Sequence, residues 1–256
     1  MKQGARDGTL RSVNDSTFGS LNHKSLIHKK DRAMNRRQFS TQLSLMGLST
    51  GLVGAPAWAQ GGPVEGKHFL RLDPPQPQAA GGKIEVIEFF WYGCPHCFHF
   101  DPALEAWTRN LPANVTFRRS HIAFGQAVHK AHQKLYYTLD AMGVEAALHM
   151  KIFNAMHVER QLLDKPEAMA DFVAKSGQDK AKFLSLYDSF SIQSKCQAAT
   201  KLMTDYKVDG VPMLAVGGKF TTSVSTAGQG MPEGEAAFKQ TLAVTDYLIK
   251  RASVKA

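Results

Sequence analysis

The most regular pattern in the chain is a nearly unbroken run of apolar and β-branched residues over positions 83–92. Such a run predicts a strand buried on both faces of a sheet, with Glu85 and Glu88 as polar exceptions. Residues 115–118 form a second, shorter run of the same kind. Between the two runs, apolar residues over 95–110 recur at helical spacing. This part of the chain therefore predicts strand, helix and strand in succession, after a short first strand at 69–72.

The middle of the chain has a different pattern, without strand signals. Apolar residues recur at helical spacing in four successive segments, 127–142, 144–157, 166–175 and 180–190. We therefore expect a compact helical block. Residues 191–206 predict a further helix, and the strand pattern returns only at 208–216.

The C-terminal part predicts a hairpin and a closing helix. Gly217-Gly218 is a tight-turn signal, after which residues 219–222 pair back onto the strand at 208–216. Helical spacing resumes over 233–251. Strands at both ends of a helical block indicate an α/β protein.

The charge of the chain is unevenly distributed. The net charge is +9, and residues 1–59 hold nine Lys and Arg against three Asp and Glu, hence +6 of that total. The remainder carries only +3. It is therefore not a strongly basic, nucleic-acid-binding segment.

The basic N-terminal region has the pattern of an export signal. Arg36 and Arg37 precede a largely apolar stretch over 39–53, and Ala57-Trp58-Ala59 supplies the small residues of a cleavage site. We expect cleavage after Ala59. The residues leave open whether the general secretory or the twin-arginine route is used. Both routes lead out of the bacterial cytoplasm.

Residues 1–33 precede this signal and are polar, without clear periodicity. Met34 stands directly before the signal and is the more natural initiator. We therefore interpret 1–33 as a non-native or disordered extension, and 34–59 as the signal peptide.

Two of the three cysteines form the motif Cys94-Pro95-His96-Cys97, directly after the predicted buried strand. A strand that leads into a helix places the first sulfur at the helix N-terminus, where free N–H groups favour a thiolate. Pro95 suits the first helical position, and His96 adds a partly positive neighbour. Stabilising the thiolate makes the disulfide form a stronger oxidant. The motif therefore predicts a redox-active pair.

Other uses of this pair are an inert disulfide or half of a zinc site. Zinc needs about four ligands, and neither a second C-x-x-C nor an H-x-x-x-H completes the set. The third cysteine, Cys196, lies on an apolar helical stripe and is expected to be a small buried residue. His99 and His121 are expected to be surface or packing residues.

Val211-Pro212 leads into the strand predicted at 208–216. Proline is tolerated there only at the start of the strand or at an unusual bond. A cis bond would place the Val211 backbone opposite the dithiol, whereas a trans bond would end a turn after Asp209-Gly210. The residues alone leave both open.

Together these segments resemble the thiol–disulfide oxidases of the DsbA family, over essentially the whole chain after the signal. The resemblance rests on residues 88–97, with Cys94-Pro95-His96-Cys97, and on Gly210-Val211-Pro212 followed by Gly217-Gly218-Lys219-Phe220. It implies a thioredoxin-like fold with an inserted all-helical domain. The expected boundaries are 60–125 and 191–256 for the thioredoxin-like domain and 126–190 for the helical insertion.

The resemblance also implies residue roles. Cys94 would be the nucleophile, Cys97 the resolving thiol of a redox-active Cys94–Cys97 disulfide, and His96 the stabiliser of the thiolate. Val211 and Pro212 would form a cis-proline loop. An acidic residue at the positions of Glu88 and Asp101 is implicated in proton handling, although Asp101 is shorter than the familiar Glu. The alternatives are a strand-edge carboxylate and a surface charge.

The expected activity is oxidation of dithiols in exported proteins in the periplasm, without a metal or diffusible cofactor. A DsbB-type membrane partner, with quinone as electron sink, would reoxidise the protein, which we expect to be a monomer. A disulfide reductase or isomerase is the alternative within redox chemistry. A periplasmic metal-binding or chaperone module is the alternative from another class.

Overall fold

The computed structural model describes residues 61–77 and 80–253, within one compact unit that spans Gly54–Ala256. The predicted extension 1–33 and signal peptide 34–59, with its cleavage site, lie outside the described residues. Within the described part of the chain, none of the helices combines the length and hydrophobicity needed to cross a membrane.

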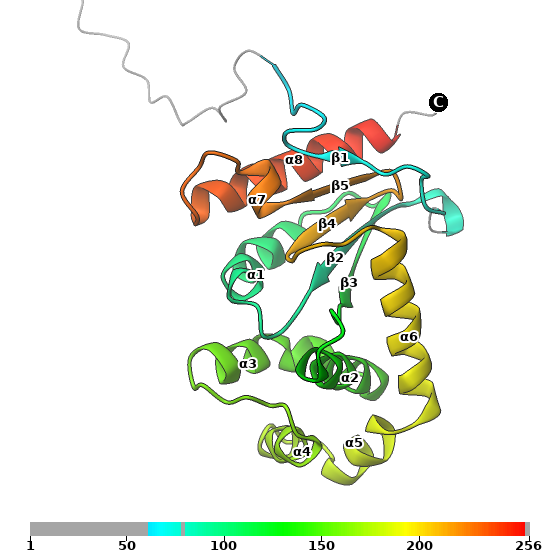
Figure 1. Ribbon diagram of the computed structural model, residues 1–256, viewed down its shortest axis with the longest axis vertical. Coiled ribbons are helices and arrows are strands. Elements are labelled where there is room, and N and C mark those ends of the chain that lie inside the picture. Colours follow the sequence, from blue (N-terminus) through cyan, green and yellow to red (C-terminus); the bar gives the residue numbers. More distant parts are fainter. Residues whose placement is uncertain (1–60, 78–79, 254–256) are drawn as a thin grey trace, which may run out of the picture. The chain divides into compact units, whose positions relative to one another are not determined.

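A five-stranded mixed sheet forms the centre of this unit, with strand order β1-β5-β4-β2-β3 (Figure 1). Its strands are β1 (Leu70–Arg71), β2 (Ile84–Phe90), β3 (Val115–His121), β4 (Met213–Val216) and β5 (Phe220–Ser223). β2 pairs in parallel with β3 and antiparallel with β4. Six of the seven residues of β2 are buried, which confirms the buried strand predicted from its sequence.

Side chains alternate between the two faces along each strand, and the apolar ones on both faces are covered by packed elements. On one face, Val86 and Leu214 pack in a core with α1 (Pro95–Thr108) and α8 (Glu235–Ser253). On the other, Ile87 and Ala215 pack against the C-terminal part of α6 (Phe190–Asp205) and the residues that follow it.

A helical block is inserted between β3 and α6, as the sequence predicted. It consists of α2 (Ala127–Met142), α3 (Glu145–His157), α4 (Pro166–Lys175) and α5 (Lys180–Tyr187). α6 then runs from this block back to the sheet (Figure 1). The core of the block, which includes Leu139, Ile152 and Phe183, also contains Cys94 and Cys97. The two cysteines therefore lie where the sheet and the helical block meet.

The C-terminal strand is shorter than predicted. β4 begins at Met213, whereas the sequence predicted a strand from 208, and a cis peptide bond joins Val211 to Pro212. Proline has no N–H for a strand ladder, so pairing with β2 begins one residue later, at Met213 opposite Phe89. The sequence also did not predict the one-turn helix α7 (Val224–Ala227) or the 3₁₀ turn at Ala80–Gly82.

The predicted glycine turn between β4 and β5 is confirmed. Gly217 and Gly218 both have positive φ angles, of 57° and 65°. A Cβ at Gly218 would lie 2.3 Å from the carbonyl oxygen of Gln76, so the position has no room for a side chain. This close approach lets the segment before η1 (Ala80–Gly82) pass over the turn.

Candidate active site

The first cysteine of the motif caps α1. Cys94 is extended (φ −87°, ψ 116°) and stands at the N-cap, with Pro95 in the first turn and no side-chain cap. Its carbonyl accepts the first helical hydrogen bond, from the N–H of Phe98 at 3.1 Å. The N–H groups of the first helical turn therefore point toward the sulfur of Cys94.

This position lowers the pKa of the Cys94 thiol to about 6. The largest cause is a hydrogen bond from the Cys97 side chain, and burial opposes it. The backbone N–H groups of Cys97 and His96, and the charge of the His96 ring, lower the pKa further. Cys94 is therefore largely a thiolate at neutral pH, as the sequence predicted.

The second cysteine has the opposite character. Cys97 is fully buried one turn into α1, and burial raises its pKa well above the usual range. The neighbouring Cys94 and the charge of Glu88 act in the same direction. The structure shows both as free thiols, so it represents the reduced form.

The cis-proline loop lies beside the reactive sulfur. The Sγ atom of Cys94 lies 3.5 Å from the carbonyl oxygen of Val211, to which it donates when it is protonated. A cavity of about 500 Å³ opens along this loop, lined by His96, Val211, Pro212, Met231 and neighbouring residues of β5 and α7. An extended chain in this cavity would meet Val211, a backbone segment able to pair with it, whose carbonyl oxygen lies 3.5 Å from the Cys94 sulfur.

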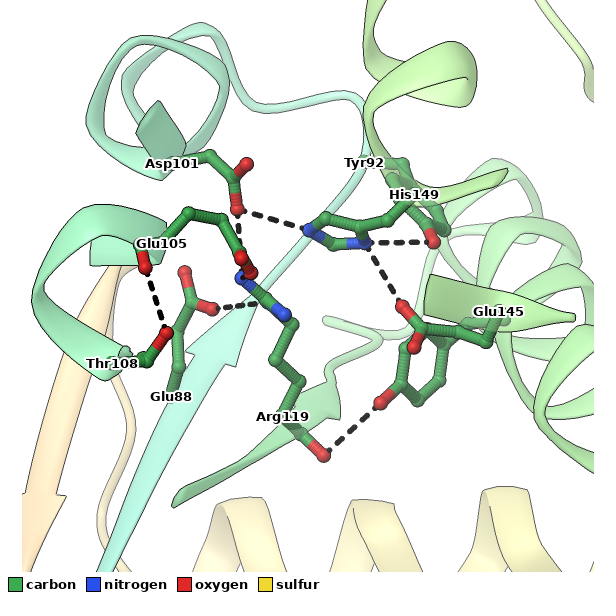
Figure 2. Close-up of polar contacts among 9 residues, drawn as sticks. Glu88, Tyr92, Asp101, Glu105, Thr108, Arg119, Glu145 and His149 are labelled. Atoms are coloured by element: carbon green, nitrogen blue, oxygen red, sulfur yellow. Dashed lines mark hydrogen bonds and ion pairs between the residues drawn. The ribbon is translucent and has the colours of Figure 1, made fainter. Parts of the chain in front are cut away.

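Behind the dithiol lies a buried cluster of charged residues (Figure 2). Glu88 on β2 and Asp101 on α1 are each 1% exposed. Arg119 on β3, which stands opposite Glu88 in the parallel register, donates to both carboxylates at 2.9 Å. It also donates to Glu105 at 2.6 Å. The guanidinium therefore holds three carboxylates from two elements together.

The helical block adds a histidine to this cluster. His149 on α3 lies 3.0 Å from Asp101 through Nε2, and its Nδ1 lies 3.1 Å from the hydroxyl of Tyr92. The same Nδ1 is 3.0 Å from a carboxylate oxygen of Glu145 (Figure 2). Through Tyr92, two residues before Cys94, the ring connects the helical block to the active-site loop.

Burial and pairing have opposite effects in this cluster. Burial raises the pKa of Glu88 to about 7, although the charge of Arg119 opposes this. Burial lowers the pKa of His149, but hydrogen bonds to Asp101 and Glu145 outweigh it and raise the pKa overall. Two groups with raised pKa values are thus enclosed behind Cys97.

The structure brings the sequence-predicted site residues into one region. Cys94, Cys97, His96, Val211 and Pro212 meet at the start of α1, with Glu88 beneath. Neither Glu88 nor Asp101 is the solvent-exposed carboxylate of the alternative interpretation. His121 is a buried packing residue that contacts the N–H of Tyr92, whereas His99 is exposed. Cys196 is only partly buried, whereas the sequence predicted a buried residue.

The sequence analysis did not identify Arg119 and His149 as parts of the site. A weak signal for Arg119 existed, because a basic residue on a strand can pair with an acidic one on its neighbour. Using it requires the register of β2 against β3. No sequence signal indicated His149, which lies on a different element and far along the chain.

In this site a dithiol at a helix N-terminus faces a cis-proline loop at the start of β4, an interior strand of the mixed sheet. This arrangement defines a thiol–disulfide oxidoreductase with a thioredoxin-like fold. A family model described as the DSBA-like thioredoxin domain matches residues 85–231. The chain belongs to the DsbA family, which confirms the predicted fold class and thiol–disulfide exchange activity.

Individual relatives agree with this assignment. The thiol:disulfide interchange protein DsbA of Burkholderia cepacia is 40% identical over 221 residues, covering 86% of this chain and 99% of the relative. That of Pseudomonas aeruginosa is 44% identical over 186 residues, covering 73% and 84%. The crystal structure of P. aeruginosa DsbA matches with a TM-score of 0.68 at 43% identity, covering 74% of this chain and 94% of that one.

Proposed function

We propose that this protein oxidises pairs of thiols in exported proteins, with Cys94 and Cys97 as its redox-active disulfide. The observation that carries the proposal is the contrast between the two sulfurs, a Cys94 thiol with a pKa of about 6 and a Cys97 thiol with a strongly raised one. A reduced form that contains a stabilised thiolate is a favourable product. The disulfide form is therefore a strong acceptor of electrons.

The reaction takes place in two exchange steps. A substrate thiolate attacks the sulfur of Cys94, the Cys94–Cys97 bond breaks, and its electron pair leaves on Cys97. Cys97 then takes up a proton. Its donor is Glu88, a buried acid with a pKa of about 7 whose charge also acts on Cys97. A second substrate thiolate attacks the mixed disulfide, and Cys94 leaves as a thiolate.

Three residues around Cys94 support these steps. His96 stabilises the thiolate through its N–H and its ring charge. Val211, whose carbonyl lies 3.5 Å from the Cys94 sulfur, would pair with the backbone of the bound substrate, and Pro212 holds that loop in place. No metal or diffusible cofactor enters the reaction, because the sulfurs carry both electrons.

The location and partners follow from the chemistry and from the export signal predicted at 34–59. Export with cleavage after Ala59 would place the protein in the periplasm, where reduced, unfolded proteins are its substrates. Each turnover leaves the protein reduced. A DsbB-type membrane protein linked to quinone would therefore return it to the disulfide form, and the protein would act as a monomer.

The test is to incubate the oxidised protein with a reduced, unfolded protein that needs disulfides for its activity. We expect substrate thiols to disappear and activity to return, while Cys94 and Cys97 become reduced in equal amount. The redox potential, measured against glutathione, should be more oxidising than that of a typical cytosolic dithiol protein. A strongly reducing potential, together with a Cys94 pKa near 9, would instead indicate a reductase.

A further inference from the structure

A second cavity, of about 390 Å³, lies between α1 and α3 on the far side of the charged cluster from the dithiol motif. Exposed residues of both helices line it, including Pro102 and Ala146, so solvent has access. The buried side chains of Asp101 and His149 form its inner wall. The cavity is therefore the place where water comes closest to the cluster behind Cys97.

The chemistry of the proposed function requires a proton to cross this region. Cys97 is 0% exposed and Glu88 only 1% exposed, so neither exchanges protons with bulk water directly. When the disulfide is reduced, Cys97 gains a proton, and when it re-forms, Cys97 loses one. A buried group that titrates in each cycle needs a connection to solvent.

Arg119 does not provide this connection, because its surrounding carboxylates raise its pKa and keep it protonated. Asp101 is a better intermediate. It is 1% exposed, and its Oδ2 atom makes no hydrogen bond with another described residue. Its other oxygen, Oδ1, contacts His149 at 3.0 Å.

We propose that His149 is the relay residue through which the buried carboxylates behind Cys97 exchange protons with solvent in the cavity between α1 and α3. This inference rests on the proposed dithiol chemistry. Protonated at Nε2, His149 gives its proton to Asp101 and recovers one from cavity water. Asp101 and Glu88 accept hydrogen bonds from Nη2 and Nε of the same guanidinium, so in the proposed route the proton passes between these two carboxylates while Arg119 keeps its own protons, and from Glu88 to Cys97, whose pKa the charge of Glu88 raises. In the opposite half of the cycle the proton leaves by the same route.

Charged and titratable groups face His149 from every element packed around it, and the two carboxylates among them favour its protonated form. They are Asp101 of α1, Glu145 of α3, Tyr92 of the active-site loop, Arg119 of β3 and the buried His121. The two carboxylates stabilise the imidazolium, whereas Arg119 opposes it. The contacts with Asp101 and Glu145 therefore favour a proton on the ring where it meets the buried carboxylate, as a relay requires.

The test compares two variants of the full protein. His149→Gln can keep hydrogen bonds to Asp101 and Tyr92 but carries no proton. His149→Gly leaves space beside the cavity for imidazole. Reduction of the oxidised proteins by a small dithiol is followed by stopped flow, with a pH indicator that records proton exchange, between pH 5 and 8.

We expect the reduction of His149→Gln at pH 7 to be about tenfold slower, at the low end of what general acid–base groups contribute. The wild-type rate, divided by the thiolate fraction of the dithiol at each pH, should show an inflection that His149 supplies, and His149→Gln should lose it. In His149→Gly, added imidazole should restore most of the lost rate in a saturable manner, compared with Tris at the same pH. A merely structural role would not be rescued in this way.

The matched control is His132→Gln. His132 is also buried, and it links Trp91 to the carbonyl of Leu162 near the active site without touching the charged cluster. Its pH profile should keep the inflection. The proposal is overturned if His149→Gln keeps the wild-type rate and profile, or if imidazole accelerates wild type and His149→Gly equally. If the wild-type protein itself does not oxidise dithiols, the proposed function fails instead.

Discussion

The two sides of the dithiol show how one short motif acquires two different sulfurs. The side that faces the cavity along the cis-proline loop is called the groove side. There, Cys94 owes its low pKa to the Cys97 side chain and to N–H groups of the same helical turn. On the buried side, Cys97 owes its high pKa first to burial beneath the sheet and the helical block. The groove side is set by residues close in sequence. The buried side depends on elements that only the complete fold brings together.

This difference has a functional consequence. The outer sulfur is a good leaving group and nucleophile because it is held as an anion. The inner sulfur stays protonated, so it attacks the mixed disulfide only when its proton can leave. The groove side therefore governs the affinity for electrons, and the buried side governs how protons follow them.

The largest expected effect comes from replacing each sulfur in turn. Cys94→Ser should reduce substrate oxidation to the uncatalysed rate, a loss on the order of 10³-fold or more, because the disulfide that the substrate thiolate attacks can no longer form. Cys97→Ser should also abolish turnover. When given a substrate that already contains a disulfide, it should nevertheless accumulate a mixed disulfide, because the Cys94 thiolate attacks the substrate disulfide, one substrate sulfur leaves as a thiolate, and no inner thiol resolves the product.

The measurement is mass spectrometry of the trapped adducts, with Cys196→Ser as the control for the third cysteine. Cys196 lies on α6, and burial raises its pKa to about 11, so it should be a poor nucleophile. Mixed disulfides that persist in Cys94→Ser at the level seen in Cys97→Ser would contradict the assigned roles.

The next effect concerns stability and comes from Glu88 on the buried side. Its pKa is about 7 in the folded protein against an ordinary value of 4.5, so the folded state binds this proton more tightly. The stability from this group is fully present below pH 4.5 and is lost as the pH rises through 7. The total change is roughly 3 kcal/mol at 1.36 kcal/mol for each pKa unit.

Glu88→Gln should remove most of this loss, because a glutamine can still accept a hydrogen bond from Arg119 and does not titrate. Urea unfolding of the oxidised form at pH 5 and pH 8 would measure it. The unfolding free energy should fall less between these values in the variant than in wild type. His149, whose raised pKa acts in the same direction, contributes equally to both proteins. An unchanged difference would show that Glu88 is not the titrating group.

The sequence could predict the groove side because its causes are local. Cys94 and Cys97 are three positions apart, Pro95 occupies the first turn, and the preceding run is an evident buried strand. The succession of strands along the chain and the helical block between them followed from equally local periodicity. The cis bond at Pro212 remained open from the residues alone, and only the family resemblance favoured it.

The buried side could not be predicted in the same way. The pairing of Glu88 with Arg119 depends on a parallel register that the hydrophobic pattern does not specify to the residue. The place of His149 depends on how α3 packs against α1. For the same reason Asp101, which the pattern left open as a surface charge, is one of the most deeply buried carboxylates described here.

The smallest expected effects come from the exposed charges near Cys94 on the groove side. His96 contributes to the lowered pKa of Cys94 both through its backbone N–H and through its ring charge, and only the second is lost in His96→Leu. We expect the pKa of Cys94 to rise above 6 by up to about one unit, since a partly exposed charge is screened by water. Thiolate absorbance during a pH titration would measure this rise.

Glu233 is the matched comparison, because its carboxylate lies 3.6 Å from the His96 ring and both side chains are more than half exposed. An exposed ion pair contributes about 0–1 kcal/mol, so Glu233→Gln should change the oxidation rate by less than about fivefold. The control is Glu235→Gln, an exposed residue paired with Lys239. A difference between these variants that persists in 0.5 M salt would contradict the screening argument and would show that Glu233 contacts the substrate itself. The buried pairs around Arg119 are shielded from solvent, so the pH dependence assigned to Glu88 should survive the same salt concentration.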